Sequence, residues 1–209
     1  MCFHPDKCFV LPISNKTAPC QHTYYLRGHA LKHVDETKYL GITLSSDLHW
    51  GSHVIQLCKK ANRTMGFLKR NLNISSCSVK ETAYKTLVRP LLEFASSAWD
   101  PGLQVDINRL QMVQRRAARY TLNRYHNRSS VSEMLDQLKW PTLQQRRKNA
   151  RLVMLYRLTN GYVQVDASDR LVPPNRLSRG MHEGSFQTFS TRCEARRQSF
   201  YPRTVQGLE

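Results

Sequence analysis

Acidic residues are scarce in this sequence: 15 Asp and Glu stand against 32 Lys and Arg in 209 residues. The formal net charge at pH 7 is therefore +17, and both halves of the chain share in the excess. A positive field of this size favours a polyanionic partner, and nucleic acid phosphate is the commonest one. We therefore expect a nucleic acid partner, whether RNA, DNA or an RNA–DNA hybrid, and no small-molecule substrate.

Long apolar runs are missing too. No stretch approaches the roughly 20 apolar residues that cross a membrane, and the residues after Met1 do not form the apolar core of a signal peptide. Cysteines show no spacing typical of a small disulfide-stapled domain, so we expect reduced thiols. The six cysteines lie at positions 2, 8, 20, 58, 77 and 193. These absences predict a nuclear or cytoplasmic protein that is not secreted and has no membrane partner.

Convergent carboxylates, which two-metal catalysis needs, are also missing. The sequence has no Asp-Asp pair, and the nearest approach is Asp35-Glu36 in an expected turn. Asp166 and Asp169 lie in an expected loop, and no Gly-x-Ser-x-Gly elbow offers a nucleophile. We therefore predict no catalytic residue and no cofactor for this chain.

A zinc-binding module over residues 1–33 is an alternative that the His and Cys content of this region leaves open. His29-x3-His33 has a spacing that suits zinc, and residues 20–22 (Cys-Gln-His) could supply two more ligands. There is no Cys-x2-Cys pair, however, and Cys8 lies in an apolar run where a thiol usually packs as a small hydrophobe. We expect no metal, and metal analysis of the purified chain decides the matter.

Strand-forming residues are confined to the first part of the chain, residues 3–44. Short apolar runs at 8–13 and 23–26 end in turn-forming residues. Residues 30–34 and 38–44 flank Asp35-Glu36-Thr37, which predicts a hairpin or a tight connection between two short strands. So few strands make no independent sheet and need a partner surface.

The apolar period becomes helical from Leu48 onward. One stripe on the first helix comprises Val54, Cys58, Ala61, Met65, Leu68 and Leu72. Ser78-Val-Lys-Glu81 predicts a capping box that opens a second helix, which should run to Trp99 with a kink or break at Pro90. "DPG" at 100–102 predicts a turn.

Three further helices are predicted beyond this turn. In the first of these helices, the residues expected to face the core are Ile107, Leu110, Val113, Ala117 and Tyr120. Ser130-Val-Ser-Glu133 is a second capping box, and Thr142 caps a last helix that Gly161 ends. Tryptophans lie at the ends of these elements and are predicted to be core or staple residues instead of base-stacking platforms. They are Trp50, Trp99 and Trp140.

Arginines and lysines collect on three of these helices and are the candidate nucleic-acid-binding residues. They are Lys59, Lys60, Arg63, Lys69 and Arg70; Arg115, Arg116, Arg119 and Arg124; and Arg146, Arg147, Lys148 and Arg151. Arg binds phosphates through forked hydrogen bonds, which set affinity for a backbone and read little sequence. The competing interpretation is a solvated helix face with i,i+4 salt bridges, and the scarcity of acidic residues within these stretches weakens it.

Seven motifs in order carry a resemblance to a known family. They are "HPDKCFVLPI", "KYLGITLSSDLHWGSHV", "KKANRTMGFLKRNL", "AYKTLVRPLLEFASSAWDP", "RLQMVQRRAARY", "SVSEMLDQLKWPTLQQRR" and "SFYPRTV". Together they resemble the C-terminal part of the reverse transcriptases of LINE-type retrotransposons, the non-long-terminal-repeat elements of the jockey-like and chicken-repeat-like groups.

The resemblance implies a fold that is mainly α with a small β portion at the N-terminus. Residues 1–47 would be the residual end of the polymerase palm, 48–161 a helical thumb-like bundle, and 162–209 a loop-rich tail. Lys7 would lie near the nucleotide phosphates. Tyr39-Leu40-Gly41 would form the primer-grip-like hairpin that supports the primer end at the palm–thumb junction.

The chain also departs from the family pattern. The catalytic aspartates, the fingers and most of the palm lie upstream of the counterpart of Cys2, and Gln206–Glu209 replaces the usual Trp-Asn-x-Leu-Pro segment. The resemblance therefore implies a truncated RNA-directed DNA polymerase that is inactive as this chain, although the intact family enzyme would use Mg²⁺. Its further partner would be the missing palm and fingers. The alternative is a stand-alone basic helical nucleic-acid-binding protein without enzymatic activity.

Overall fold

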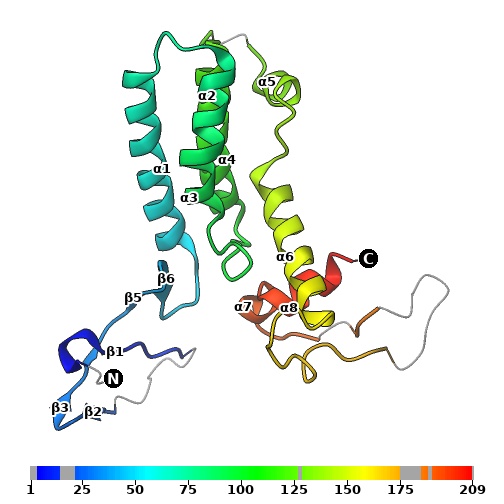
Figure 1. Ribbon diagram of the computed structural model, residues 1–209. Coiled ribbons are helices and arrows are strands. Elements are labelled where there is room, and N and C mark those ends of the chain that lie inside the picture. Colours follow the sequence, from blue (N-terminus) through cyan, green and yellow to red (C-terminus); the bar gives the residue numbers. More distant parts are fainter. Residues whose placement is uncertain (1–3, 15–21, 127–128, 175–184, 188–189, 209) are drawn as a thin grey trace.

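Helices dominate the part of the chain that the structure, a computed structural model, describes, namely residues 4–14, 22–126, 129–174, 185–187 and 190–208. The larger helices are α1 (Gly51–Asn71), α2 (Cys77–Ala83), α3 (Arg89–Glu93), α4 (Gln104–Leu122), α5 (Val131–Gln137) and α6 (Leu143–Thr159). α1, the α2–α3 segment and α4 lie side by side, and α5 and α6 follow along the other side of the bundle (Figure 1). The prediction of a mainly α fold with a small N-terminal β portion is confirmed.

α4 is the central helix because it contacts α1, α2, α5 and α6. Its sequence supports this position, since the predicted inward residues are all buried. They are Ile107, Leu110, Val113, Ala117 and Tyr120. Gln114 is buried as well and donates from its side-chain amide to the Pro141 carbonyl at 2.9 Å. Asn123 then ends the helix in the left-handed conformation, with φ 53°.

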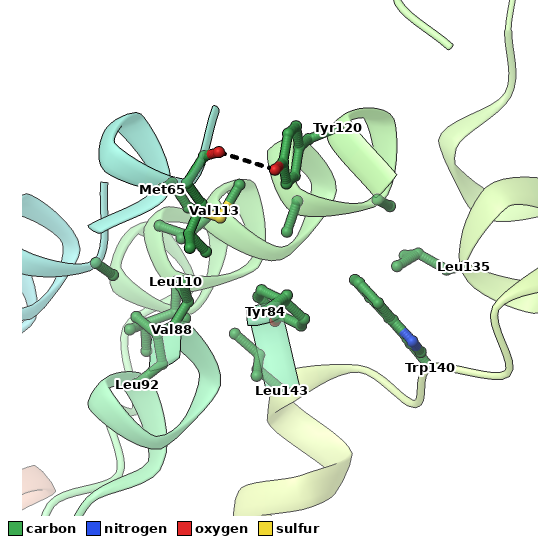
Figure 2. Packing of buried hydrophobic residues seen from close by; sticks show 14 of the residues in the cluster. Met65, Tyr84, Val88, Leu92, Leu110, Val113, Tyr120, Leu135, Trp140 and Leu143 are labelled. Carbon is green, nitrogen blue, oxygen red and sulfur yellow. Dashed lines mark hydrogen bonds between the residues drawn. The ribbon is translucent and has the colours of Figure 1, made fainter. Parts of the chain in front are cut away.

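The hydrophobic core lies where these helices meet (Figure 2). Four residues of the predicted stripe on α1 are fully buried, and Cys58 and Leu72 are partly buried. Tyr120 adds a polar contact across the core, because its hydroxyl donates to the Leu68 carbonyl at 3.0 Å. Trp99 and Trp140 are buried as predicted, and Trp140 stacks on Tyr84 with 4.4 Å between ring centroids.

Helix starts were predicted correctly at two positions and wrongly at one. The side chains of Ser130 and Thr142 accept from the amides of Glu133 and Gln145 at 3.4 and 3.1 Å, as expected for N-caps. The cap of α2 is Ser76 instead of Ser78, because Ser76 Oγ accepts from the Val79 amide. Glu81, which the predicted box would turn back to the helix start, accepts from Trp140 Nε1 at 2.9 Å.

The second predicted helix is interrupted at Pro90, as expected, and ends earlier than expected. A π-helical turn over Tyr84–Val88 precedes Pro90, which stands in the first turn of α3 where no intrahelical amide is needed. The prediction that the helix continues to Trp99 is wrong, because α3 ends at Glu93 and Ala95 has φ 53°. The resulting turn buries the Trp99 ring, whose Nε1 donates to the Phe94 carbonyl at 2.7 Å.

Strands in the N-terminal segment are short. Two-residue pairs join β1 (Phe9–Val10) to β4 (Lys32–His33) in parallel and β2 (Tyr25–Leu26) to β3 (His29–Ala30) in antiparallel fashion. A 3₁₀ turn, Pro5–Lys7, precedes them. No residue of these four strands is buried.

The one longer hairpin pairs β5 (Glu36–Tyr39) with β6 (Ile42–Ser45). The prediction of a hairpin at Asp35–Thr37 is therefore wrong, although residues 34–35 do form a short connection between β4 and β5. The chain reverses at Leu40 and Gly41, whose φ angles are 47° and 89°. Positive φ at both central residues is the two-residue turn that matches the twist of a hairpin, and glycine at the second position favours it. The polar composition of residues 35–37 is therefore a weaker turn signal than the single glycine.

His53 ties this hairpin to the first turn of α1. The Thr43 amide donates to His53 Nδ1 at 3.2 Å, and the imidazole packs edge-on against the Trp99 ring. Burial, with a smaller effect of the Lys38 charge, lowers the pKa of His53 from 6.5 to about 4.

The C-terminal residues add two short helices, α7 (Glu194–Arg197) and α8 (Phe200–Gln206). α8 packs against α6 and buries Pro202, Thr204 and Val205. Among the described residues, no helix has the length and apolar character needed to cross a membrane.

We predict that His53 makes stability depend on pH between about 7 and 4. Because its pKa is lower in the folded than in the unfolded chain, the unfolded chain takes up the proton first as pH falls, so stability falls below pH 6.5. Urea denaturation should give a free energy of unfolding roughly 2 kcal/mol lower at pH 5 than at pH 7.5. His53→Asn, which keeps an acceptor for Thr43, should lose this dependence.

The control is His29→Asn, which removes an exposed imidazole and should leave the pH dependence unchanged. The same pH dependence in His53→Asn as in the original chain would show that His53 does not cause it.

Candidate nucleic-acid interface

α1 presents basic side chains without any acidic neighbour in its own sequence. All five predicted residues of this helix are exposed, and no Asp or Glu occurs between Gly51 and Asn71. They are Lys59, Lys60, Arg63, Lys69 and Arg70. The apolar stripe at every third or fourth residue fixes which side of α1 packs, and the basic residues fall mostly off that stripe.

α4 continues this basic surface across its contact with α1. Arg115 and Arg116 are exposed and Arg119 is half-buried, while Asp106 is the one acidic residue of the helix. The two helices meet at a hydrogen bond from Arg116 Nη1 to Asn62 Oδ1 of 3.2 Å. We give the name α1–α4 face to basic residues of these two helices together with Arg124, which lies just beyond the end of α4. Its members are Lys59, Arg63, Lys69, Arg70, Arg115, Arg116, Arg119 and Arg124.

None of these eight residues, nor Lys60, has a carboxylate partner among the described residues. The interpretation as a salt-bridged helix face therefore has no support for these nine residues. Cationic groups so placed remain available to phosphates.

Two further residues accompany the α1–α4 face and were not predicted. Lys69 Nζ lies 5.8 Å from the centre of the Tyr125 ring, and Arg109 is an exposed residue of α4 whose charge, like that of Arg116, acts on Cys58 of α1. Tyr125 follows the Asn123 cap, and only the fold brings it across to α1. Arg109 is paired with Asp106 at 2.7 Å, so its charge is partly neutralised.

The basic run of α6 behaves differently, because its side chains find acidic partners from other elements. Arg146 forms a two-pronged contact with Glu93, with Nη2 at 3.0 Å from Oε2. Arg147 Nε donates to Asp100 Oδ1 at 2.7 Å, and Arg151 also pairs with Asp100. The expectation that this run lacks acidic partners is therefore wrong, since sequence spacing shows only partners on the same helix.

Burial decides what these arginines can do. Arg147 and Arg151 are 1% and 6% exposed, so neither can reach a duplex on the surface of this fold. Removal from water lowers the pKa of both guanidinium groups to about 10, which still leaves them charged at neutral pH. Lys148, on the same helix, is half-buried and has no acidic partner among the described residues.

Asp100 stands at the centre of this cluster. Arg203 of α8 is a third cation there, donating from Nη1 to the Asp100 carbonyl at 2.7 Å and placing Nη2 3.5 Å from the carboxylate. Asp100 itself is 6% exposed. One carboxylate therefore connects the loop before α4 to α6 and α8.

The hairpin residues expected to support a primer end are exposed at the β5–β6 turn. Tyr39 and Leu40 are 64% and 76% exposed, and a Cβ on Gly41 would lie 3.2 Å from the Phe94 ring. Lys7 is exposed in the 3₁₀ turn near the N-terminus. The roles that the resemblance implies for Tyr39, Leu40, Gly41 and Lys7 therefore stay predictions.

The described residues do not fit a metal site. Among them no group of three or more His, Cys, Asp or Glu side chains converges, and the buried Asp100 and Asp106 are already paired with arginines. Cys20, which the zinc alternative would use, lies outside the described residues. Burial raises the pKa of Cys58 to about 11, so this thiol is protonated at neutral pH.

Comparison with known proteins gives similarity over part of the chain. A probable RNA-directed DNA polymerase from transposon BS of Drosophila melanogaster is 31% identical over 118 residues, which are 54% of this chain. The RNA-directed DNA polymerase from the mobile element jockey of Drosophila melanogaster is 27% identical over 118 residues. The aligned region covers 13% of the length of each of these relatives.

This similarity supports a region related to transposon RNA-directed DNA polymerases. No family model matches the chain, and no solved structure matches it.

We predict that Asp100→Asn destabilises the fold strongly, because it leaves three cations around a neutral side chain. Breaking a buried ion pair from one side costs about 3–5 kcal/mol. Urea denaturation at pH 7 should show this fall in the free energy of unfolding. The control Asp136→Asn, at an exposed position of α5, should change it by less than about 0.5 kcal/mol. A loss below about 1 kcal/mol in Asp100→Asn would contradict the central role of the carboxylate.

Proposed function

We propose that this chain is a reverse-transcriptase-derived module that binds a nucleic acid duplex on its α1–α4 face. The observation that carries the proposal is the set of unpaired cations on two packed helices. Similarity to transposon RNA-directed DNA polymerases supports an RNA–DNA template–primer duplex as the ligand.

The physical argument begins with charge. Each basic side chain that neutralises a phosphate releases a condensed counterion, so many such contacts give strong, salt-dependent and sequence-independent binding. Two packed helices present their cations along two lines, so the contacts can follow more than one stretch of the phosphate backbone of a duplex. Lys69 above Tyr125 adds an aromatic surface to the α1–α4 face.

The resemblance assigns roles to the parts around this face. In the proposal, residues 1–47 are the end of a palm, 48–161 a thumb-like bundle and 162–209 the tail. The hairpin turn at Tyr39-Leu40-Gly41 then supports a primer end, and Lys7 lies toward nucleotide phosphates. The exposure of all four residues is consistent with these roles.

We further propose that residues 1–209 do not polymerise nucleotides on their own. The intact family enzyme would use Mg²⁺, and the described carboxylates do not fit a pair of such ions. The sequence also lacks an adjacent aspartate pair. In this view the palm and fingers of a parent polymerase are a partner of this module.

A stand-alone nucleic-acid-binding protein is the second candidate, and the closed helical core favours it. Core residues such as Val54, Leu110 and Leu143 are completely buried without any other chain. Thermal unfolding of residues 1–209 separates the two candidates. A single cooperative transition without aggregation supports an independent domain, whereas a broad transition supports a module that needs the rest of a polymerase.

We predict that filter binding to an RNA–DNA hybrid weakens steeply with salt. Arg63→Gln with Arg116→Gln should reduce the slope of log K against log[salt] by about two, because two phosphate contacts are lost. The matched control is Arg157→Gln with Arg170→Gln, which removes two exposed cations outside the α1–α4 face and should keep the slope. A flat salt response of the original chain, or equal effects of both pairs, would refute the proposed interface.

A primer-extension assay with Mg²⁺ tests the proposed lack of activity. We expect no templated incorporation by residues 1–209 on a primed RNA or DNA template. A complete polymerase of the same family, assayed in parallel, shows that the template and conditions are adequate. Any extension of the primer above a protein-free reaction would refute this part of the proposal.

A further inference from the structure

A second concentration of positive charge lies away from the α1–α4 face, in a pocket at the start of α6. Its volume is about 170 Å³. The pocket is bounded by the first turns of α6 and by α8. Its lining consists of Asp100, Thr142, Gln144, Gln145, Lys148, Arg151 and Arg203.

The charges of this lining do not balance. Lys148, Arg151 and Arg203 face one carboxylate, that of Asp100, and Arg147 contacts the same carboxylate from behind. The repulsion is visible in the pKa values, because the Arg203 charge lowers that of Arg151 and the Arg147 charge lowers that of Arg203, each in addition to a larger effect of burial. A further anion would relieve this repulsion.

A buried donor of the lining also remains unused. Arg151 is 6% exposed, and no described residue accepts a hydrogen bond from its Nε. A buried donor without an acceptor costs about 1–3 kcal/mol, more for a charged group, so an acceptor in the pocket would stabilise the fold.

The helix geometry adds to this preference. Thr142 caps α6, a helix of 17 residues whose N-terminus carries partial positive charge toward the pocket. Gln144 and Gln145 add neutral side chains of the first turn at the rim. Apart from Asp100, whose charge three arginines share, no acidic residue lines the space.

We propose that this pocket binds a phosphate group. A tetrahedral dianion offers several acceptor oxygens at once, which suits two guanidinium groups and an ammonium group better than a single carboxylate would. The group is either a free phosphate or phosphomonoester, or a backbone phosphate of a nucleic acid. The proposal does not depend on the α1–α4 face, because it involves none of the same residues.

Calorimetric titration of the full chain with inorganic phosphate, against potassium chloride at equal ionic strength, tests this site. Lys148→Gln should weaken phosphate binding about tenfold, because one charged donor is lost. Gln144→Glu should weaken it to a similar extent by placing a negative charge at the rim. Gln144 is exposed and Lys148 half-buried, and neither has an ion pair among the described residues to lose, so both variants should fold.

Two controls match these variants in charge. Lys60→Gln removes one exposed lysine of α1, and Gln104→Glu adds a carboxylate to the first turn of α4. Both should bind phosphate as the original chain does. Absence of phosphate binding beyond the chloride control, or an equal loss in all four variants, would overturn the proposal.

Binding of the RNA–DNA hybrid by Lys148→Gln distinguishes a nucleic acid backbone from a free phosphate as the group in the pocket. If a nucleic acid backbone fills the pocket, this variant should lower the salt slope for the RNA–DNA hybrid by about one. If a free phosphate fills it, hybrid binding should be unchanged while phosphate binding is weakened. Both results support the site, and Arg63→Gln with Arg116→Gln should leave phosphate binding intact in either case.

Discussion

The buried carboxylate of Asp100 is the contact on which the arrangement of the second half of the chain depends. It lies in the turn between α3 and α4, and it holds Arg147 and Arg151 of α6 and Arg203 of α8. These segments are separated by up to 103 positions in the sequence. Because desolvated charges tolerate few alternative geometries, this contact fixes where α6 and α8 pack against the bundle more narrowly than apolar contacts alone would.

Much of the helical fold follows from local signals in the sequence. The stripes of α1 and α4, the caps at Ser130 and Thr142 and the break at Pro90 are each encoded within one or two turns. The features that were missed depend on distant contacts or on single backbone angles. Trp140 takes the Glu81 side chain away from its own helix, and the helix expected to reach Trp99 ends at Glu93, shortly before Ala95 with its positive φ.

The residues of the candidate interface also fall into those that local sequence could locate and those that depend on distant contacts. The basic residues of α1 and α4 could be located from the sequence, since these helices lack acidic residues between Asp106 and the end of α4 and throughout α1. The run on α6 looked equivalent in sequence but is largely internal, because Glu93 and Asp100 reach it from the other side of the fold. Only tertiary structure distinguishes an arginine that holds the fold together from one that is available to a ligand.

This division of the arginines has a consequence for how the molecule meets a polyanion. A sequence isoelectric point of about 10.0 suggests that every basic residue contributes alike, yet Glu93 and Asp100 hold four arginines of α6 and α8 in ion pairs. A paired guanidinium group is held in one geometry by the fold, whereas the exposed cations of the α1–α4 face have no such carboxylate partner among the described residues. Charge counted along the sequence therefore overstates the charge that is free to meet a polyanion.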